Sequence, residues 1–264
     1  MTFKNKTIWL TGASSGIGEA CAYLFAREKA NLILTALEED KLQEVQKKCV
    51  SLGGKCEILP YDLSNIDEIP ALVESALQFF GRIEIMFNNA GISQRAKAGE
   101  TSFEVDKKIM DVNFFAPLRI AKLLISQMIE NGGGTFVTTT SISGRFGFPL
   151  RSAYCASKHA LYGFFETIHA EYYNQNIRCV MVCPGRVQTN ISYYALEKNG
   201  AQHGKLDAGQ KNGIPVEKAA KRIVRAIRKQ KPEVLVGGKE LLLVYIKRFF
   251  PALYRKISRI ISPE

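Results

Sequence analysis

Short apolar runs alternate with longer segments of helical periodicity over the first two thirds of the chain. The apolar runs are rich in β-branched residues and stay apolar at successive positions, which is typical of strands buried on both faces of a parallel sheet. We therefore predict an α/β fold with a doubly wound parallel sheet in three layers. The expected strands span residues 7–10, 31–36, 56–61, 83–87, 135–141 and 177–183, and the expected helices span residues 16–28, 40–51, 66–80, 115–130 and 151–175.

The polar segment 186–213 follows the sixth expected strand and breaks this pattern. It contains two Asn-Gly pairs and the adjacent aromatic residues Tyr193 and Tyr194. A connection of this length inside a compact domain is usually functional or mobile. A substrate lid and a plain surface insertion both fit the pattern, and we interpret the segment as a substrate loop within one domain of residues 1–238.

Residues 239–264 form a C-terminal tail in which apolar residues recur every three or four positions. The apolar stripe comprises Leu242, Ile246, Phe249, Leu253, Ile257 and Ile260. Basic residues lie largely off this stripe, which predicts a basic amphipathic extension that Pro251 kinks or divides. The longest uncharged apolar run has six residues, whereas a membrane-spanning helix needs ~20. Two interpretations stay open: peripheral contact with an anionic membrane through residues 240–261, or coverage of the protein's own core or of a partner subunit.

The formal net charge of +11 is concentrated near the C-terminus, where residues 214–264 hold thirteen Lys or Arg against four Glu. The basic residues lack a recognised nucleic-acid-binding motif, so no nucleic-acid partner is expected. Six cysteines without a Cys-x-x-Cys pair and only three histidines argue against a metal site. They favour reduced thiols in a cytoplasmic protein, and the N-terminal residues lack the apolar region of a secretory signal.

A glycine-rich turn follows the first expected strand and directly precedes the first expected helix. Its sequence, TGASSGIG at residues 11–18, permits a tight turn and the close approach of a phosphate to backbone N–H groups at the helix N-terminus. The strand before it and the helix after it are the context that a dinucleotide-binding turn requires.

Tyr154 and Lys158 stand four residues apart in the sequence YCASK, near the start of the last long expected helix. Four residues make about one helical turn, so the phenol and the ammonium project from the same face. This spacing alone does not distinguish a catalytic pair from a buried tyrosine beside a solvated lysine.

Further motifs stand in a fixed order, namely NNAG at residues 88–91, Asn113, Ser141 and Pro184-Gly185. Together with the glycine-rich turn and YCASK, they resemble the short-chain dehydrogenases/reductases in order and spacing. The resemblance implies a Rossmann-type domain. It also implies an NAD(P)-dependent oxidoreductase that interconverts a ketone or aldehyde and an alcohol.

The resemblance also implies catalytic roles. Tyr154 would be the general acid or base at the substrate oxygen, and it needs help because a free tyrosine titrates near pH ~10. Lys158 would supply a positive charge that favours the phenolate and would hold the nicotinamide ribose. Ser141 would hydrogen-bond the substrate oxygen, and Asn113 would position a water that links Lys158 to solvent. The expected substrate contacts are Ser143, Tyr193 and Tyr194.

The choice between NAD and NADP is unresolved, because the end of the second strand carries neither usual marker. Ala36 occupies the position of the usual acid and Leu37 that of the usual arginine, while Glu38 would repel a 2′-phosphate. We expect a weak or dual preference. Besides Tyr154 and Lys158, the residues expected to bind the cofactor are Gly12, Ser14, Ser15, Ile17, Gly18, Leu37, Asp62, Leu63, Asn89, Ala90, Gly91, Pro184, Gly185, Val187 and Thr189.

The tail and the loop look most like the branch of dehydrogenase/reductase family member 7 proteins, which implies a lipophilic carbonyl substrate. A 3-ketoacyl-acyl-carrier-protein-type reductase is the alternative enzyme, since a basic patch would dock an acidic carrier. A non-catalytic nucleotide-binding module that associates with a membrane is the alternative of another class. The family resemblance further suggests a homo-oligomer, either a dimer or a tetramer.

Overall fold

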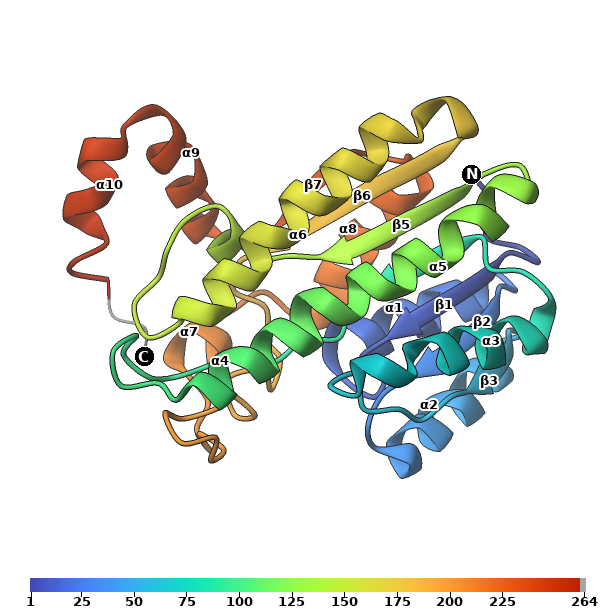
Figure 1. Ribbon diagram of the computed structural model, residues 1–264, viewed down its shortest axis with the longest axis horizontal. Helices are drawn as coiled ribbons and strands as arrows, with labels where there is room; N and C mark the ends of the chain where they lie inside the picture. Colours follow the sequence, from blue (N-terminus) through green and yellow to red (C-terminus); the bar gives the residue numbers. More distant parts are fainter. Residues whose placement is uncertain (262–264) are drawn as a thin grey trace.

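The computed structural model describes residues 1–261, and the last three residues of the predicted tail lie outside the described part. Within the described residues, seven strands form one parallel sheet in the order β3-β2-β1-β4-β5-β6-β7 (Figure 1). This arrangement confirms the predicted doubly wound sheet. The strands are β1 Thr7–Thr11, β2 Asn31–Thr35, β3 Lys55–Ile58, β4 Ile85–Asn88, β5 Gly134–Thr139, β6 Ile177–Pro184 and β7 Glu233–Val236.

Helices cover both faces of the sheet, as buried strands require (Figure 1). Residues of β1 show the division, since Ile8 and Leu10 pack into one core cluster and Trp9 into the other. One face is covered by α1 Gly16–Arg27, α2 Glu39–Ser51 and α8 Val216–Arg228. The other face is covered by α3 Ile69–Phe80, α5 Ala116–Glu130 and α6 Ser152–Glu171.

The strand order reverses between β1 and β4. The chain builds β2 and β3 on one side of β1 and then crosses to β4 on the other side. In open parallel sheets, ligands bind outside the carboxyl ends of the strands at such a switch point. The glycine-rich turn after β1 and the NNAG segment after β4 therefore meet where a ligand is expected.

Several predicted boundaries differ from the structure by a few residues. The strand expected at 56–61 ends at Ile58, and the one expected at 83–87 begins at Ile85. The helix expected at 151–175 ends at Glu171 and is followed by a 3₁₀ turn. The pattern also missed α4 Phe103–Met110, a short helix whose first turn is capped by the Ser102 hydroxyl.

The loop after β6 is long but not devoid of structure. It includes the short helix α7 Ala208–Lys211, and Leu196 forms an isolated bridge with Gln94 from the segment after β4. The Leu196 carbonyl accepts the amide hydrogen of Arg95. These contacts hold the loop across the carboxyl end of the sheet.

The tail forms two short helices, α9 Leu242–Phe249 and α10 Pro251–Ile257, which the Phe250–Pro251 step divides. The predicted single stripe is only partly correct. Leu242 and Phe249 from the stripe are exposed, whereas Tyr254 from outside it is buried. The chain changes direction at Pro251 between α9 and α10. The residues of the predicted stripe therefore do not all face the same surface. No helix in residues 1–261 is long and apolar enough to cross a membrane.

Candidate active site

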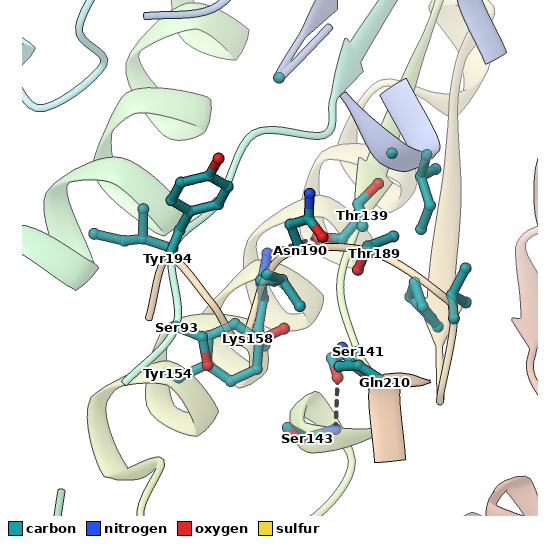
Figure 2. A pocket seen from close by; sticks show the side chains of 18 of the residues that line it. Ser93, Thr139, Ser141, Ser143, Tyr154, Lys158, Thr189, Asn190, Tyr194 and Gln210 are labelled. Atoms are coloured by element: carbon teal, nitrogen blue, oxygen red, sulfur yellow. Dashed lines mark hydrogen bonds between the residues drawn. The ribbon is translucent and has the colours of Figure 1, made fainter. Parts of the chain in front are cut away.

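A cavity of about 720 Å³ lies at the carboxyl ends of the central strands. Residues of the glycine-rich turn, the segments after β4, β5 and β6, helix α6 and the tail line it. Figure 2 shows Tyr154 and Lys158 from α6 together with Ser141 and Ser143, which follow β5. The segments that the sequence motifs singled out thus converge on one space.

The glycine-rich turn is shaped by its contact with the NNAG segment. Gly12 has a φ of +63°, and a Cβ added there would lie 2.7 Å from the Ala90 Cα. The Asn89 Nδ2 donates hydrogen bonds to the carbonyls of Thr11 and Gly12 at 3.3 and 3.1 Å. The turn therefore has room for backbone but not for a side chain at this position.

The start of α1 faces the cavity directly after this turn. Ser14, Ser15 and Ile17 line the cavity as predicted. Gly18 instead lies beneath the turn, where an added Cβ would come within 2.0 Å of the Gly12 carbonyl oxygen. Gly18 thus serves close packing of the turn on α1 and does not line the cavity, and its predicted part in binding the cofactor stays a prediction.

The end of the cavity near β2 and β3 is lined by Leu37, Glu38, Asp62 and Leu63. The Ser14 hydroxyl donates to the Glu38 carboxylate at 3.1 Å, and Lys41 forms an ion pair with the same carboxylate at 3.1 Å. Burial alone would raise the pKa of Glu38, but the hydrogen bonds from Lys41 and Ser14 lower it below its ordinary value. A carboxylate therefore occupies the mouth of this end of the cavity.

The neighbouring part of the cavity is lined by the segments after β4 and β6. Asn89, Ala90 and Gly91 lie on one side as predicted. On the other side, the lining residues are Pro184, Gly185, Val187 and Thr189. The structure thus brings these predicted cofactor-binding residues to one cavity, and their contacts with a cofactor stay a prediction.

Tyr154 and Lys158 are both buried and project from consecutive turns of α6. The Lys158 Nζ donates to the Thr139 carbonyl at 2.8 Å and lies 5.7 Å from the centroid of the Tyr154 ring. Burial lowers the pKa of Lys158 to about 7. Burial raises the pKa of Tyr154, while a hydrogen-bonding interaction with Ser141 and the charge of Arg151 oppose that rise.

Ser141 lies directly beyond β5 and faces the cavity. Its hydroxyl accepts the backbone N–H of Ser143 at 3.1 Å (Figure 2). This bond uses a lone pair and leaves the hydroxyl proton available to another acceptor. Ser143 also lines the cavity, as predicted.

Asn113 lies behind the cavity wall. Its Oδ1 accepts the N–H of Ile92 at 2.9 Å, and its Nδ2 donates to the Ile92 carbonyl and to the Ser157 hydroxyl. It sits in a π-helical segment, Asp111–Phe115, a local irregularity that often occurs at functional sites. A Cβ added at Gly91 would lie 3.2 Å from the Asn113 Oδ1 and 3.3 Å from the Lys158 Nζ. Asn113 and Lys158 therefore pack against the same point of the NNAG segment.

Gln94 caps the N-terminus of α6, a role that the sequence pattern missed. Its Oε1 accepts the backbone N–H groups of Ala153 and Tyr154 at 2.9 and 3.3 Å. Its Nε2 donates to the hydroxyls of Thr101 and Ser152. One fully buried side chain thus holds the first turn of the helix that carries Tyr154.

A buried charged cluster beside Tyr154 was also missed. Arg95 donates to both oxygens of the Asp207 carboxylate, and Arg151 donates to its Oδ2 at 2.9 Å. All three residues line the cavity. Burial and the neighbouring Arg95 lower the pKa of Arg151 to about 10.

The two tyrosines of the loop take different positions. Tyr194 lines the cavity (Figure 2), and the Lys41 Nζ lies 5.7 Å from its ring centroid. Tyr193 packs edge-on against Tyr194 and is half exposed outside the cavity-lining set. Of the two tyrosines predicted at the substrate, the structure therefore brings only Tyr194 to the cavity, because adjacent residues of an irregular loop point in different directions.

Comparisons with known proteins agree with this geometry. The short chain dehydrogenase family model matches residues 6–200. A "Dehydrogenase/reductase SDR family protein 7-like" from Drosophila melanogaster is 35% identical over 254 residues, which are 94% of this chain and 78% of that protein. The "Dehydrogenase/reductase SDR family member 7B" of Mus musculus is 34% identical over 259 residues, covering 96% of this chain and 80% of that protein.

Two solved structures share the fold. A short chain dehydrogenase/reductase from Burkholderia phymatum in complex with NAD superposes with a TM-score of 0.84 at 22% identity, over 96% of both chains. A putative NAD(P)-dependent gluconate 5-dehydrogenase from Beutenbergia cavernae, with NADP bound at low occupancy, gives a TM-score of 0.69 at 30% identity. That alignment covers 72% of this chain and 76% of the other. With the family model over most of its length and member 7 relatives aligned along nearly all of it, the chain belongs to the short-chain dehydrogenase/reductase family, in its member 7-like branch.

Proposed function

We propose that the protein is an NAD(P)-dependent oxidoreductase that interconverts a lipophilic ketone or aldehyde and the corresponding alcohol. One observation carries this proposal. Tyr154 and Lys158 are buried one helical turn apart and face, with Ser141, the same cavity as the glycine-rich turn.

The backbone that lines the cavity fits a nicotinamide dinucleotide. Gly12 packs its backbone against Ala90, and Ser14, Ser15 and the N-terminus of α1, with its unpaired amides, face the cavity directly after it, which suits a pyrophosphate. Leu37 and Asp62 would lie at the adenosine, and Thr189 would lie at the carboxamide. When bound, the nicotinamide supplies or accepts the hydride.

Tyr154 is proposed to hold the proton that moves to or from the substrate oxygen. Burial raises the pKa of its phenol, which suits an acid in the direction of reduction but hinders the phenolate needed for oxidation. Lys158 would favour the phenolate when it is charged, because a nearby cation stabilises the anion. The Ser141 hydroxyl would donate to the substrate oxygen and stabilise the charge that develops there.

Asn113 is proposed to act by positioning. Its amide binds Ile92 and Ser157, and it packs against the same glycine as Lys158. It would therefore keep the Lys158 side chain in place and order water beside it.

The apolar lining of the substrate end supports a lipophilic substrate. This part of the cavity is lined by Ile142, Phe148, Ile191, Leu196 and Leu243. Apolar walls with a few convergent polar groups are typical of small-molecule sites. We also propose that the protein is a cytoplasmic homo-oligomer with peripheral membrane contact through residues 240–261. Subcellular fractionation tests the location and the membrane contact, and light scattering tests the oligomeric state.

The decisive test compares Tyr154→Phe with wild type. The variant is expected to lose at least about 100-fold in ketone reduction and to keep its affinity for NADH and NADPH in a fluorescence titration. Tyr173→Phe, at an exposed site beyond α6, is the matched control. Undiminished turnover by Tyr154→Phe would overturn the proposed acid. A wild-type protein that binds a cofactor but turns over no ketone or alcohol would be the non-catalytic nucleotide-binding alternative, and one that binds neither cofactor would overturn the proposed function.

A further inference from the structure

Two arginines share one buried carboxylate in the wall of the cavity. Arg95 donates from Nε to both oxygens of Asp207 and from Nη2 to its Oδ2, and Arg151 donates to the same Oδ2 at 2.9 Å. The side chains of Arg95 and Asp207 are 3% and 2% exposed, and that of Arg151 is 18% exposed. The Arg95–Asp207–Arg151 cluster therefore carries one excess positive charge at a place that water barely reaches.

The three members of the cluster approach Tyr154 from three segments of the chain. Arg151 directly precedes α6, and Tyr154 lies in the first turn of that helix. Arg95 follows Gln94, whose side chain accepts the backbone N–H of Tyr154 at 3.3 Å. Asp207 comes from the loop after β6. All three members line the same cavity as Tyr154, so the excess charge lies beside the proposed reaction site.

The charge of the cluster acts on the phenol of Tyr154. Burial raises the pKa of this phenol, and the charges of Arg151 and Arg95 both act in the opposite direction. A neighbouring cation favours the ionised form of an acid, and a buried cation is screened by salt much less than an exposed one. The cluster therefore offsets part of the penalty that burial imposes on the phenolate.

The titratable groups of α6 do not supply this charge at every pH. Burial lowers the pKa of Lys158 to about 7, so above that pH its charge is lost in the cofactor-free protein. Burial raises the pKa of the Cys155 thiol, which therefore stays neutral. Burial and the charge of Arg95 lower the pKa of Arg151 only to about 10. The cluster thus keeps a cation beside Tyr154 where Lys158 has become neutral.

The charged groups of the other elements around Tyr154 do not cancel the cluster. Of the charged residues of α4, Lys108 lines the cavity and adds a positive charge. In the loop after β6, the His203 Nε2 lies 3.9 Å from the Asp207 Oδ1, and its Nδ1 contacts the Glu197 carboxylate at 2.5 Å. The Glu197 side chain is 38% exposed, so solvent screens its negative charge. The net charge that faces the phenol is therefore positive.

We propose that the Arg95–Asp207–Arg151 cluster supports the Tyr154 phenolate when the protein oxidises an alcohol. In that direction the hydroxyl proton of the alcohol passes to the phenolate oxygen, and the hydride passes from the alcohol carbon to the oxidised nicotinamide. Arg151 and Arg95 act through Tyr154, so they are positioning residues. The effect on turnover rests on the proposed function, whereas the effect on the phenol can be measured without turnover.

Arg151→Gln tests the cluster by removing its excess charge, because Arg95 still pairs with Asp207 in this variant. The kcat for oxidation of 2-octanol is measured against pH with NAD and with NADP. The midpoint at which kcat rises should move up by about one pH unit, the low end for a neighbouring opposite charge, which lowers kcat at pH 7 about tenfold. Reduction of 2-octanone at pH 7 should change less, since it uses the protonated phenol.

Two further substitutions at other charges serve as controls. Arg151→Lys keeps a cation at the same position and should recover most of the shift. Arg119→Gln removes the cation of the pair with the exposed Asp67, and it should keep the wild-type midpoint. An unshifted midpoint in Arg151→Gln would overturn the proposal.

Asp207→Asn should move the midpoint in the other direction. This variant removes the carboxylate of the cluster, which then carries two positive charges. Its kcat should fall because the loop loosens, but its midpoint should move down by about one pH unit. A purely structural role of Arg151 and Asp207 would not produce opposite shifts from the two substitutions. Shifts in the same direction would therefore contradict the proposal.

Phenolate absorbance distinguishes the cluster from the proposed function. The ultraviolet absorbance is recorded around the ordinary tyrosine pKa of ~10, for each protein and for the same protein with Tyr154→Phe, and the difference reports Tyr154. Arg151→Gln should show less phenolate than wild type at each pH, and Asp207→Asn should show more. These shifts in a protein that oxidises no 2-octanol would remove the proposed function and leave the cluster intact. Oxidation of 2-octanol with a Tyr154 titration that Arg151→Gln leaves unchanged would do the reverse.

Discussion

The Arg95 Nη2 donates to the Asp207 Oδ2 at 2.5 Å, and this buried ion pair joins the segment after β4 to the loop after β6. The two residues are 112 positions apart in the sequence. The Asp207 backbone N–H donates to the Ser192 hydroxyl within the same loop. The loop is therefore fastened over the cavity at a charged anchor rather than by apolar packing alone.

Asp207→Asn is expected to destabilise the protein and loosen this loop. Removing one partner of a buried ion pair typically costs about 3–5 kcal/mol, because the guanidiniums stay buried without their counter-charge. The free energy of unfolding in urea measures the loss, and limited proteolysis within residues 186–213 reports the loosening.

Asp67→Asn is the matched control for this change. Asp67 pairs with Arg119 at 3.0 Å, but its side chain is almost fully exposed. Exposed ion pairs contribute little to the free energy of unfolding, so the control should unfold at the same urea concentration as wild type. Equal behaviour of the two variants would show that the Arg95–Asp207 pair does not anchor the loop.

Lys158→Met is expected to stabilise the cofactor-free protein while it abolishes activity. Burial lowers the pKa of Lys158 to about 7, whereas a lysine in the unfolded chain titrates near pH ~10.4. Between these values the unfolded chain binds a proton that the folded chain lacks, so wild-type stability rises with pH across this window. Below about pH 7 both states bind the proton, and the penalty from this group is constant.

Unfolding of wild type and Lys158→Met should therefore be compared at several pH values from 6 to 10. The free energy of unfolding of the variant should exceed that of wild type by a few kcal/mol at pH 6 to 7, since one pKa unit corresponds to about 1.4 kcal/mol. This difference in free energy should narrow as the pH approaches 10. Loss of the hydrogen bond to the Thr139 carbonyl offsets part of the gain. Lys122→Met on the exposed side of α5 serves as control. A pH-independent gap would contradict the buried, titrating lysine.

Leu37→Arg is expected to raise the affinity for NADPH about tenfold relative to that for NADH. Leu37 is 67% exposed yet lines the cavity beside Glu38, so a guanidinium there can reach a 2′-phosphate. A gain of about 1.4 kcal/mol corresponds to tenfold, which is at the low end for a charged hydrogen bond because Glu38 competes for the guanidinium. Fluorescence titrations with both cofactors measure the ratio, and Leu37→Gln controls for size without charge. An unchanged ratio would mean that position 37 lies away from the adenosine ribose.

The parts of the site that could be predicted are those with a local pattern. Continuous apolar runs predicted the strands because burial on both faces demands them, and one helical turn placed Tyr154 and Lys158 on one face. The boundaries at Ile58 and Ile85 depended on which backbone groups find a partner strand, which a local pattern does not encode.

The remaining parts depend on contacts between distant residues. In the sequence, Asp207 is an ordinary polar residue of a loop. Its ion pair with Arg95 forms only in the folded protein, so no local pattern indicates it. Tyr193 and Tyr194 are neighbours of the same type, and only the path of the loop decides which one faces the cavity. The tail has a clear helical period, but the break before Pro251 reassigns its faces, so Tyr254 rather than Leu253 reaches the core.

Gln94→Met is expected to lower turnover while it leaves cofactor affinity unchanged, because Gln94 positions α6 without lining the proposed cofactor site. Methionine keeps the volume but removes the oxygen that accepts the N–H groups of Ala153 and Tyr154. Two buried donors then lack their partner, which costs about 1–3 kcal/mol of stability. The first turn of α6 shifts as a result. Even a slight displacement of Tyr154 should lower kcat about tenfold. Gln94→Glu restores an acceptor at the helix N-terminus and should recover part of the lost kcat. Full turnover by the methionine variant, or a loss of kcat that the glutamate variant does not recover, would assign Gln94 a purely structural part.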